Sequence, residues 1–231
     1  MTDRVDQLGL ELARVAAGEF IFGEEGQMRC LPDFWMGRNL VSSRQYAAFV
    51  QATGWRPPAH WHGTRPEESL QEHPVVNIYW ADAVAFCQWA GCSLPTEAEW
   101  EKAARGVVGF TFPWGSSLPT PTRCNFDMQI GATTPVGAYS PQGDSPYGCA
   151  DMSGNVWEWT ASWFDEECRY RVLRGGGFRY RDLDVRTTCR LSILPDSCYN
   201  DVGFRVLRRQ LPAPEATTGE SGVGESGLAP L

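Results

Sequence analysis

The segment Arg174-Gly175-Gly176, followed by a long polar and aromatic stretch and closed by Gly203-Phe204-Arg205, decides the fold of this chain. An upstream run, Gly154-Asn155-Val156-Trp157-Glu158-Trp159, accompanies it. Glycines are typical of positions where a side chain would clash or where φ is positive. Arginines offer planar, forked donors for carboxylates and carbonyls. These motifs predict a rigid frame around residues 177–202, whose own contents look free to vary.

Composition limits the classes of protein that this chain can belong to. Its 231 residues allow one domain or two small ones, and its 10 Trp and 11 Phe predict an aromatic, loop-rich core. A net charge of −8 argues against a nucleic-acid partner, which would require a basic face. Neither a transmembrane segment nor the apolar centre of a signal peptide is seen, so we expect no membrane insertion and a cytoplasmic location, with export by another route left open. The 8 Cys lack metal-ligand spacing and are expected to be free thiols.

Three regions are expected along the chain. Residues 1–11 are predicted to be a leader and residues 12–209 to form the folded domain. Residues 210–231 contain no aromatic residue and are rich in Pro, Ala, Gly, Ser, Thr and Glu. Such a segment cannot bury enough apolar surface to fold, so a disordered tail is predicted.

Local patterns predict the main elements of the domain. A strand and turn are expected over residues 14–23. Helices are expected over residues 42–54, which has a Ser cap and ends at a glycine, and over residues 81–90. A third helix begins at Thr96, whose capping box is completed by Glu99, and ends at Gly106. From residue 110 onward, Pro, Gly, Ser and Thr predict loops and short strands.

Several longer motifs carry a resemblance to a known family. They are residues 73–76 (HPVV), 94–106 (LPTEAEWEKAARG), 112–115 (FPWG), 134–137 (TPVG), 151–159 (DMSGNVWEW), 172–176 (VLRGG) and 203–205 (GFR). In this order they resemble the formylglycine-generating enzyme (sulfatase-modifying factor) family over roughly residues 12–208. The resemblance implies an α+β, C-type-lectin-like fold, which is loop-rich and has short strands and about three helices.

The resemblance does not fix the activity, because one fold hosts many functions. Formylglycine generators hold copper with two cysteines shortly after the Arg-Gly-Gly motif, and thiolates suit Cu(I). Here residues 177–185 contain no cysteine, and Cys189 and Cys198 fall where the family places no copper ligand. Copper is therefore not expected.

Related iron enzymes use three histidines and an added N-terminal helical domain that this sequence does not include. The chain has only His60, His62 and His73. His60 and His62 could place two imidazoles near one ion if their loop were extended. The alternative is a solvated loop pair, with His73 structural, and on balance iron is not expected either.

A third branch of the family, the variable proteins of diversity-generating retroelements, resembles the chain most. Their last segment has a frame of Arg-Gly-Gly, an aromatic residue, a hydrophobe-Arg pair, a further Arg, Pro-Asp and Gly-Phe-Arg. The sequence matches this frame at Arg174, Phe178, Val185-Arg186, Arg190, Pro195-Asp196 and Gly203-Phe204-Arg205. The resemblance then assigns ligand binding to the positions between these points, namely Arg179, Tyr180, Arg181, Leu183, Asp184, Cys189, Leu191, Ser192, Ile193, Leu194, Ser197, Tyr199, Asn200 and Asp201.

The residue types at these positions agree with diversification. A retroelement of this kind turns AAY codons into NNY, which cannot encode Lys, Glu, Gln, Met or Trp. None of these five occurs at the assigned positions, although Lys and Glu are among the commonest residues. Tyr180, Tyr199 and the neighbouring arginines are types that anchor interfaces. Leu191, Ile193 and Leu194 would add an apolar patch, unless they point inward and pack the core.

The resemblance also implies one calcium site. Asp151 and Glu158 would give carboxylate oxygens, and Gly154 and Val156 backbone carbonyls, a mixture that calcium accepts. The alternative is that Glu158 pairs with an arginine of the frame. Trp157 and Trp159 are expected in the core, and Arg174, Arg190 and Arg205 are expected to be buried, paired struts.

Two classes of function follow from these observations. The first is a non-enzymatic protein that displays a hypervariable C-terminal surface to a protein or cell-surface ligand. The second is a divergent, metal-dependent oxidoreductase of the formylglycine-generating type. A fixed accessory domain that binds one partner is a third, plainer option.

Overall fold

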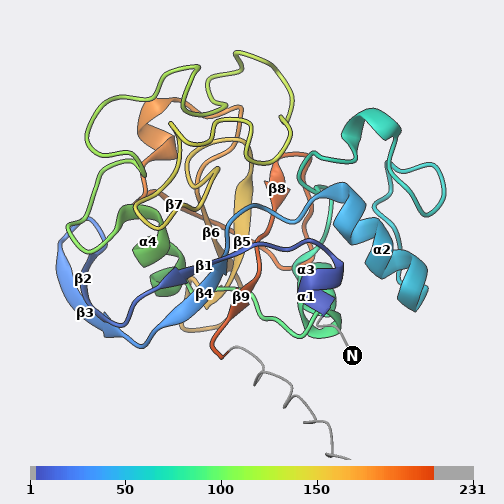
Figure 1. Ribbon diagram of the computed structural model, residues 1–231, viewed down its shortest axis with the longest axis horizontal. Coiled ribbons are helices and arrows are strands. Elements are labelled where there is room, and N and C mark those ends of the chain that lie inside the picture. Colours follow the sequence, from blue (N-terminus) through green and yellow to red (C-terminus); the bar gives the residue numbers. More distant parts are fainter. Residues whose placement is uncertain (1–3, 211–231) are drawn as a thin grey trace, which may run out of the picture.

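The computed structural model describes residues 4–210, which fold into an α+β domain (Figure 1). The predicted tail therefore lies outside the described residues from residue 211 onward. The helices are α1 (Arg4–Gln7), α2 (Ser43–Thr53), α3 (Trp80–Trp89) and α4 (Glu97–Arg105), with 3-10 turns at Glu68–Leu70 and Asp182–Val185. The strands are β1 (Leu12–Val15), β2 (Gly18–Phe22), β3 (Gln27–Leu31), β4 (Phe34–Gly37), β5 (Trp157–Trp163), β6 (Arg171–Arg174), β7 (Arg190–Ile193), β8 (Val202–Gly203) and β9 (Leu207–Arg208).

The three predicted helices are confirmed, and their ends have the expected chemistry. Ser42 caps α2 through a capping box with Gln45, and Gly54 ends it with φ +71°. Thr96 caps α4 and accepts a hydrogen bond from the Glu99 amide. These contacts satisfy backbone donors that a helix end leaves without a partner, which is why local sequence located the helices well.

The single strand predicted over residues 14–23 is instead two strands in different sheets. β1 ends at Val15 and β2 begins at Gly18. The buried amine of Lys102 donates hydrogen bonds to the carbonyls of Ala16 and Gly18 at 2.7 and 3.0 Å. Gly18, with φ +130°, stands at this break, and Lys102 of α4 adds a contact that is distant in sequence.

Three small sheets make up the β structure of residues 4–210. β1, β4 and β9 form one antiparallel sheet, and β2 and β3 form a hairpin. The third sheet has the order β7-β6-β5-β8, in which β8 runs parallel to β5. The long irregular segment that precedes β5, green to yellow in Figure 1, lies over one end of the molecule. The third sheet is the one that carries the candidate site.

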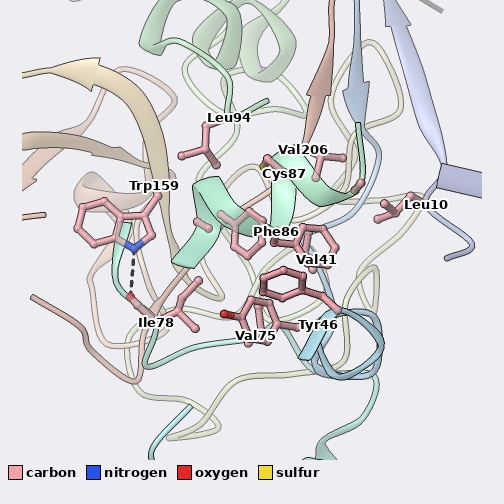
Figure 2. Packing of buried hydrophobic residues seen from close by; sticks show 14 of the residues in the cluster. Leu10, Val41, Tyr46, Val75, Ile78, Phe86, Cys87, Leu94, Trp159 and Val206 are labelled. Carbon is pink, nitrogen blue, oxygen red and sulfur yellow. Dashed lines mark hydrogen bonds between the residues drawn. The ribbon is translucent and has the colours of Figure 1, made fainter. Parts of the chain in front are cut away.

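The largest apolar cluster joins α2, α3 and the third sheet (Figure 2). Tyr46 of α2 stacks on Phe86 of α3 with 5.8 Å between ring centroids. The Trp159 indole donates a hydrogen bond to the carbonyl of Ile78 at 3.3 Å. Trp157 and Trp159 are thus core residues, as expected from the sequence. Val5 and Leu10, from the segment expected to be a leader, are buried in the same cluster.

The helices within the described residues are short. None of them is long and apolar enough to cross a membrane.

Candidate functional site

Arg205, from the closing Gly-Phe-Arg motif, is a fully buried strut. Its Nε and Nη2 donate to the two carboxylate oxygens of Glu158 on β5, at 2.6 and 2.7 Å. Its remaining donors reach the carbonyls of Gly37, Arg38 and Ala150. One guanidinium therefore ties β5 to the end of β4 and to the irregular segment before β5. The expectation of a buried, paired arginine is confirmed here.

Arg174, from the Arg-Gly-Gly motif, is the second buried strut. Its guanidinium pairs with Glu101 and Glu97 of α4, the latter at 3.3 Å. It also donates to the carbonyls of Thr187 and Thr188 at 2.7 and 2.9 Å. The start of the segment 177–202 is thereby fixed to α4.

Arg190 was expected to be buried like Arg174 and Arg205, and this expectation is wrong. It pairs with Glu97 at 2.9 Å as expected, but its side chain is 44% exposed. It begins β7, which is the edge strand of the third sheet, so one side of its side chain faces solvent.

The four residues assigned to calcium lie at the base of the same frame. Burial raises the pKa of Asp151 to about 6, and one of its oxygens accepts the Gly137 amide at 2.7 Å. Both oxygens of Glu158 are engaged by Arg205, and one also accepts the Trp100 indole at 2.9 Å. The pairing of Glu158 with an arginine of the frame is therefore present. Asp151 is the one carboxylate of the set without such a partner, so these residues fit calcium only in part, and calcium stays a prediction.

Calcium binding can be tested directly by thermal unfolding. If Asp151, Glu158 and the two carbonyls hold the ion, free calcium at about a hundredfold above its Kd should stabilise the fold by roughly 3 kcal/mol relative to chelator. Magnesium serves as the control, because it prefers a tighter octahedral shell that keeps several waters. Identical melting curves with calcium and with chelator would show that Asp151 and Glu158 serve the frame alone.

A cavity of about 330 Å³ lies on the opposite face of the third sheet from the struts. Its floor comes from all four strands, with Trp157 on β5, Leu173 on β6, Leu191 and Ile193 on β7, and Val202 on β8. Its walls come from the segment 177–202, with Arg179, Tyr180, Tyr199, Asn200 and Asp201. We call this space the display cavity.

Strand alternation separates the display cavity from the frame. Arg174, Glu158 and Arg190 are cross-strand partners in one row of the sheet. Trp159, Leu173 and Leu191 are partners in the row on one side of it, and Trp157 and Val202 are partners in the row on the other side. Because neighbouring residues of a strand point to opposite faces, the struts lie on one face and the cavity floor on the other. A second cavity, of about 580 Å³, lies on the strut side and is lined by Arg174, Cys189 and Arg190 among others.

The structure brings together half of the positions assigned to ligand binding. Arg179, Tyr180, Leu191, Ile193, Tyr199, Asn200 and Asp201 line the display cavity. Cys189 lines the other cavity. The remaining positions lie outside both cavities and are partly or fully exposed, namely Arg181, Leu183, Asp184, Ser192, Leu194 and Ser197.

The predicted apolar patch is divided by the fold. Leu191 and Ile193 are partly buried and pack against the main core cluster while lining the display cavity. Leu194 follows the strand and is 44% exposed. The inward alternative therefore holds for the two strand residues but not for Leu194.

Three residues of the cavity floor were not assigned from the sequence, namely Trp157, Leu173 and Val202. Leu173 directly precedes Arg174 of the frame, and Val202 directly precedes Gly203. The period of two along a strand would have placed both on the face opposite the frame motifs. This alternation could have identified Leu173 and Val202 from the sequence, but only after β6 and β8 had been recognised as strands.

The electrostatics of the display cavity centre on Asp201, which is 8% exposed. Burial raises the pKa of Asp201, while Arg179 lowers it from 3.8 Å away. Burial also raises the pKa of Tyr180, with the Asp201 charge acting in the same direction and the Trp157 indole opposing it. The cavity therefore holds a sequestered acid beside two aromatic rings.

The histidines do not gather at the site. His60 Nδ1 lies 3.2 Å from the Asn77 amide nitrogen, and His62 is exposed. His73 Nδ1 lies 2.9 Å from the Thr133 hydroxyl, and burial lowers the pKa of His73. Within residues 4–210 no group of three or more His, Cys, Asp or Glu side chains could hold a metal ion.

Comparison with known proteins agrees with this architecture. A profile of the sulfatase-modifying factor enzyme 1-like domain matches residues 4–210. The inactive C-alpha-formylglycine-generating enzyme 2 of Bos taurus is 40% identical over 177 residues, which cover 68% of this chain and 56% of that protein. The formylglycine-generating enzyme of Thermomonospora curvata is 34% identical over 260 residues, covering 78% of this chain and 84% of that protein.

A solved structure shares the fold. Treponema denticola variable protein 1 superposes with a TM-score of 0.70 at 21% identity, covering 86% of this chain and 95% of that one. At this identity the likeness bears on the fold and not on the ligand. The frame motifs, the order of the elements and the profile match agree with one another. The chain belongs to the formylglycine-generating enzyme family, as a sulfatase-modifying factor enzyme 1-like domain with a C-type-lectin-like fold.

Proposed function

We propose that this protein is a non-enzymatic ligand-binding protein that displays a diversified C-terminal surface on a rigid scaffold. The display cavity carries this proposal, because its walls and two of its five floor residues, Leu191 and Ile193, come from positions that the variable-protein frame assigns to the ligand. The frame residues Arg174, Phe178, Val185 and Arg205 are buried and lie outside the cavity lining. Side chains on the cavity can thus change while the supports stay the same.

The chemistry and size of the cavity suit recognition. A volume of about 330 Å³ lies at the lower end of the range for ligand pockets and is large enough for one side chain of a protein partner. Tyr199 is 50% exposed at its rim, and Arg179 is also exposed. Tyr and Arg are the types that most often anchor interfaces, since they offer large contact area or forked hydrogen bonding.

The oxidoreductase alternative lacks comparable support among the described residues. Residues 177–185, directly after Arg-Gly-Gly, contain no cysteine, and Cys189 and Cys198 further on are free and partly buried. Burial also raises the pKa of Cys189, which disfavours the thiolate that a soft metal needs. Redox-active metal that copurifies with the protein at one equivalent would nevertheless favour the enzyme over the binding protein.

Diversification can be tested by sequencing the 3′ end of the gene and its flanking DNA across a population. We expect changes confined to the assigned codons, such as those of Arg179, Tyr180 and Leu191, beside a near-identical repeat that carries AAY at those places. An invariant segment with no neighbouring repeat would contradict the proposal and leave a fixed binder or an enzyme.

The proposed function also predicts that substitutions in the walls of the display cavity have little effect on the stability of the fold. Tyr199→Ala should change the free energy of unfolding by less than about 1 kcal/mol, because the ring is half exposed. Tyr180→Ala should cost somewhat more, roughly 1–2 kcal/mol, because its ring packs edge-on against Trp157 at 5.2 Å. Tyr46→Ala is the control, since its ring is fully buried and its loss should cost roughly 3–5 kcal/mol. Urea unfolding of the three variants measures this, and a Tyr180 or Tyr199 effect as large as that of Tyr46 would make these residues structural.

A further inference from the structure

We propose that the display cavity receives the ammonium or guanidinium group of a basic side chain, Lys or Arg, presented by a protein ligand and neutralised by Asp201. This inference rests on the proposed function, because it takes the display cavity to be the ligand site. It adds the charge and chemical class of the group that enters.

Asp201 is a buried carboxylate to which no other described residue is closely paired. It is 8% exposed, yet its one ion pair within the described chain is to Arg179, at 3.8 Å. No other described residue donates a hydrogen bond of normal geometry to its side chain, whereas Glu158 accepts three such bonds. A carboxylate that is removed from water without full compensation is costly, so a cation that reaches it gains an unusually strong partner.

Arg179 does not fill this role. Its side chain is 50% exposed, and its Nη2 donates instead to the Asn200 side chain at 2.9 Å. Its guanidinium also lies 5.3 Å from the centre of the Phe178 ring, which holds it at the rim. An exposed, loosely paired arginine can turn outward at little cost, because surface ion pairs contribute little to stability.

The rest of the cavity suits the stem and head of a basic side chain. Leu173, Leu191 and Ile193 form an apolar floor on which methylene groups can lie. Trp157 and Tyr180 stand perpendicular at 5.2 Å, and aromatic faces attract cations.

The Trp157 indole N–H marks the cavity as incomplete. It is buried and makes no hydrogen bond of normal geometry within residues 4–210, although Tyr180 lies near enough for the indole to lower its pKa. Buried donors in proteins are almost always paired, so a water or a ligand atom is expected beside it. The same N–H provides a reporter inside the cavity.

The charge of the whole chain favours the same class of partner. A net charge of −8 attracts basic surfaces and repels acidic ones over distances comparable to the Debye length. A basic partner would therefore be steered toward this protein before any contact forms.

The test uses the full chain, labelled with ¹⁵N, and three probes of similar length but different charge: n-butylammonium, 1-butanol and n-pentanoate. The Trp157 indole resonance, assigned with Trp157→Phe, reports binding in the cavity. We expect n-butylammonium to shift this resonance saturably and the other two probes to bind at least about tenfold more weakly. Asp201→Asn should weaken n-butylammonium binding by about tenfold or more. Asp196→Asn, which removes the same charge from an exposed position in the neighbouring turn, should change it by less than about twofold.

Three other results would contradict the inference, and each can be distinguished from a failure of the proposed function. If n-pentanoate or 1-butanol shifts the resonance as strongly as n-butylammonium, the cavity binds ligands but does not select a cation, and the proposed function survives. If Asp201→Asn and Asp196→Asn behave alike, Asp201 is not the partner of the cation. If none of the probes shifts the resonance, the cavity does not take a basic side chain, and population sequencing decides the proposed function separately.

Discussion

Arg205→Ala should lower the free energy of unfolding by roughly 3–5 kcal/mol, among the largest effects of any single substitution in this protein. Arg205 and Glu158 are both fully buried and share two hydrogen bonds of 2.6 and 2.7 Å. Removing the arginine leaves the Glu158 carboxylate in the core with only the Trp100 indole as a donor. It also removes the donors that satisfy the carbonyls of Gly37, Arg38 and Ala150.

Arg209→Ala is the matched control for this prediction. Arg209 also pairs with a glutamate, Glu99, at 2.9 Å, but its side chain is 50% exposed. Its loss should cost less than about 1 kcal/mol, because water replaces the partner. Urea unfolding of both variants measures the difference. Equal midpoints would show that burial of the Arg205–Glu158 pair does not hold the frame together.

Gly176→Ala should cost roughly 2–5 kcal/mol, which is the second large effect we expect. Gly176 has φ +76°, and a Cβ there would lie 2.7 Å from the Val185 side chain and 2.8 Å from the Asp184 carbonyl. Asp184 and Val185 end the 3-10 turn of the variable segment, so this backbone would have to move. The substitution should therefore disturb the segment as well as the fold.

Gly54→Ala separates the two causes of this cost. Gly54 has a similar φ, +71°, but a Cβ there would have no atom within 4 Å. Its substitution should cost about 1 kcal/mol, which measures the strain of positive φ alone. Thermal or urea unfolding of both variants gives the difference that is due to close packing. If Gly176→Ala costs no more than Gly54→Ala, Gly176 is needed for its φ and not for close contact.

The helices were predictable because their signals are local. The capping boxes of Ser42 and Thr96 and the glycine after α2 lie within a few residues of the bonds that they make. β1 and β2 were predicted as one strand, and the contact that holds the break between them comes from Lys102, more than 80 residues further on. Local reasoning could not foresee a contact of that range.

The candidate site was predictable only in part, because the burial of its residues also depends on contacts that are distant in sequence. The frame motif separated supports from variable positions, and burial agrees for Arg174 and Arg205. It did not separate Asp201, which is 8% exposed, from exposed neighbours such as Asn200. Arg190 was expected to be buried like the other struts, but an edge strand leaves one side of it in water.

The sequence by itself determined the family, the α+β class and the arginines of the frame through its motifs. It determined the three main helices because caps act through near neighbours in the chain. Only the tertiary structure decided which variable positions share a cavity. Its floor joins β5, β6, β7 and β8, which the sheet brings into register from separate parts of the chain. The direction of each side chain depends on the period of two along those strands, and a shift of one residue would exchange the floor for the frame.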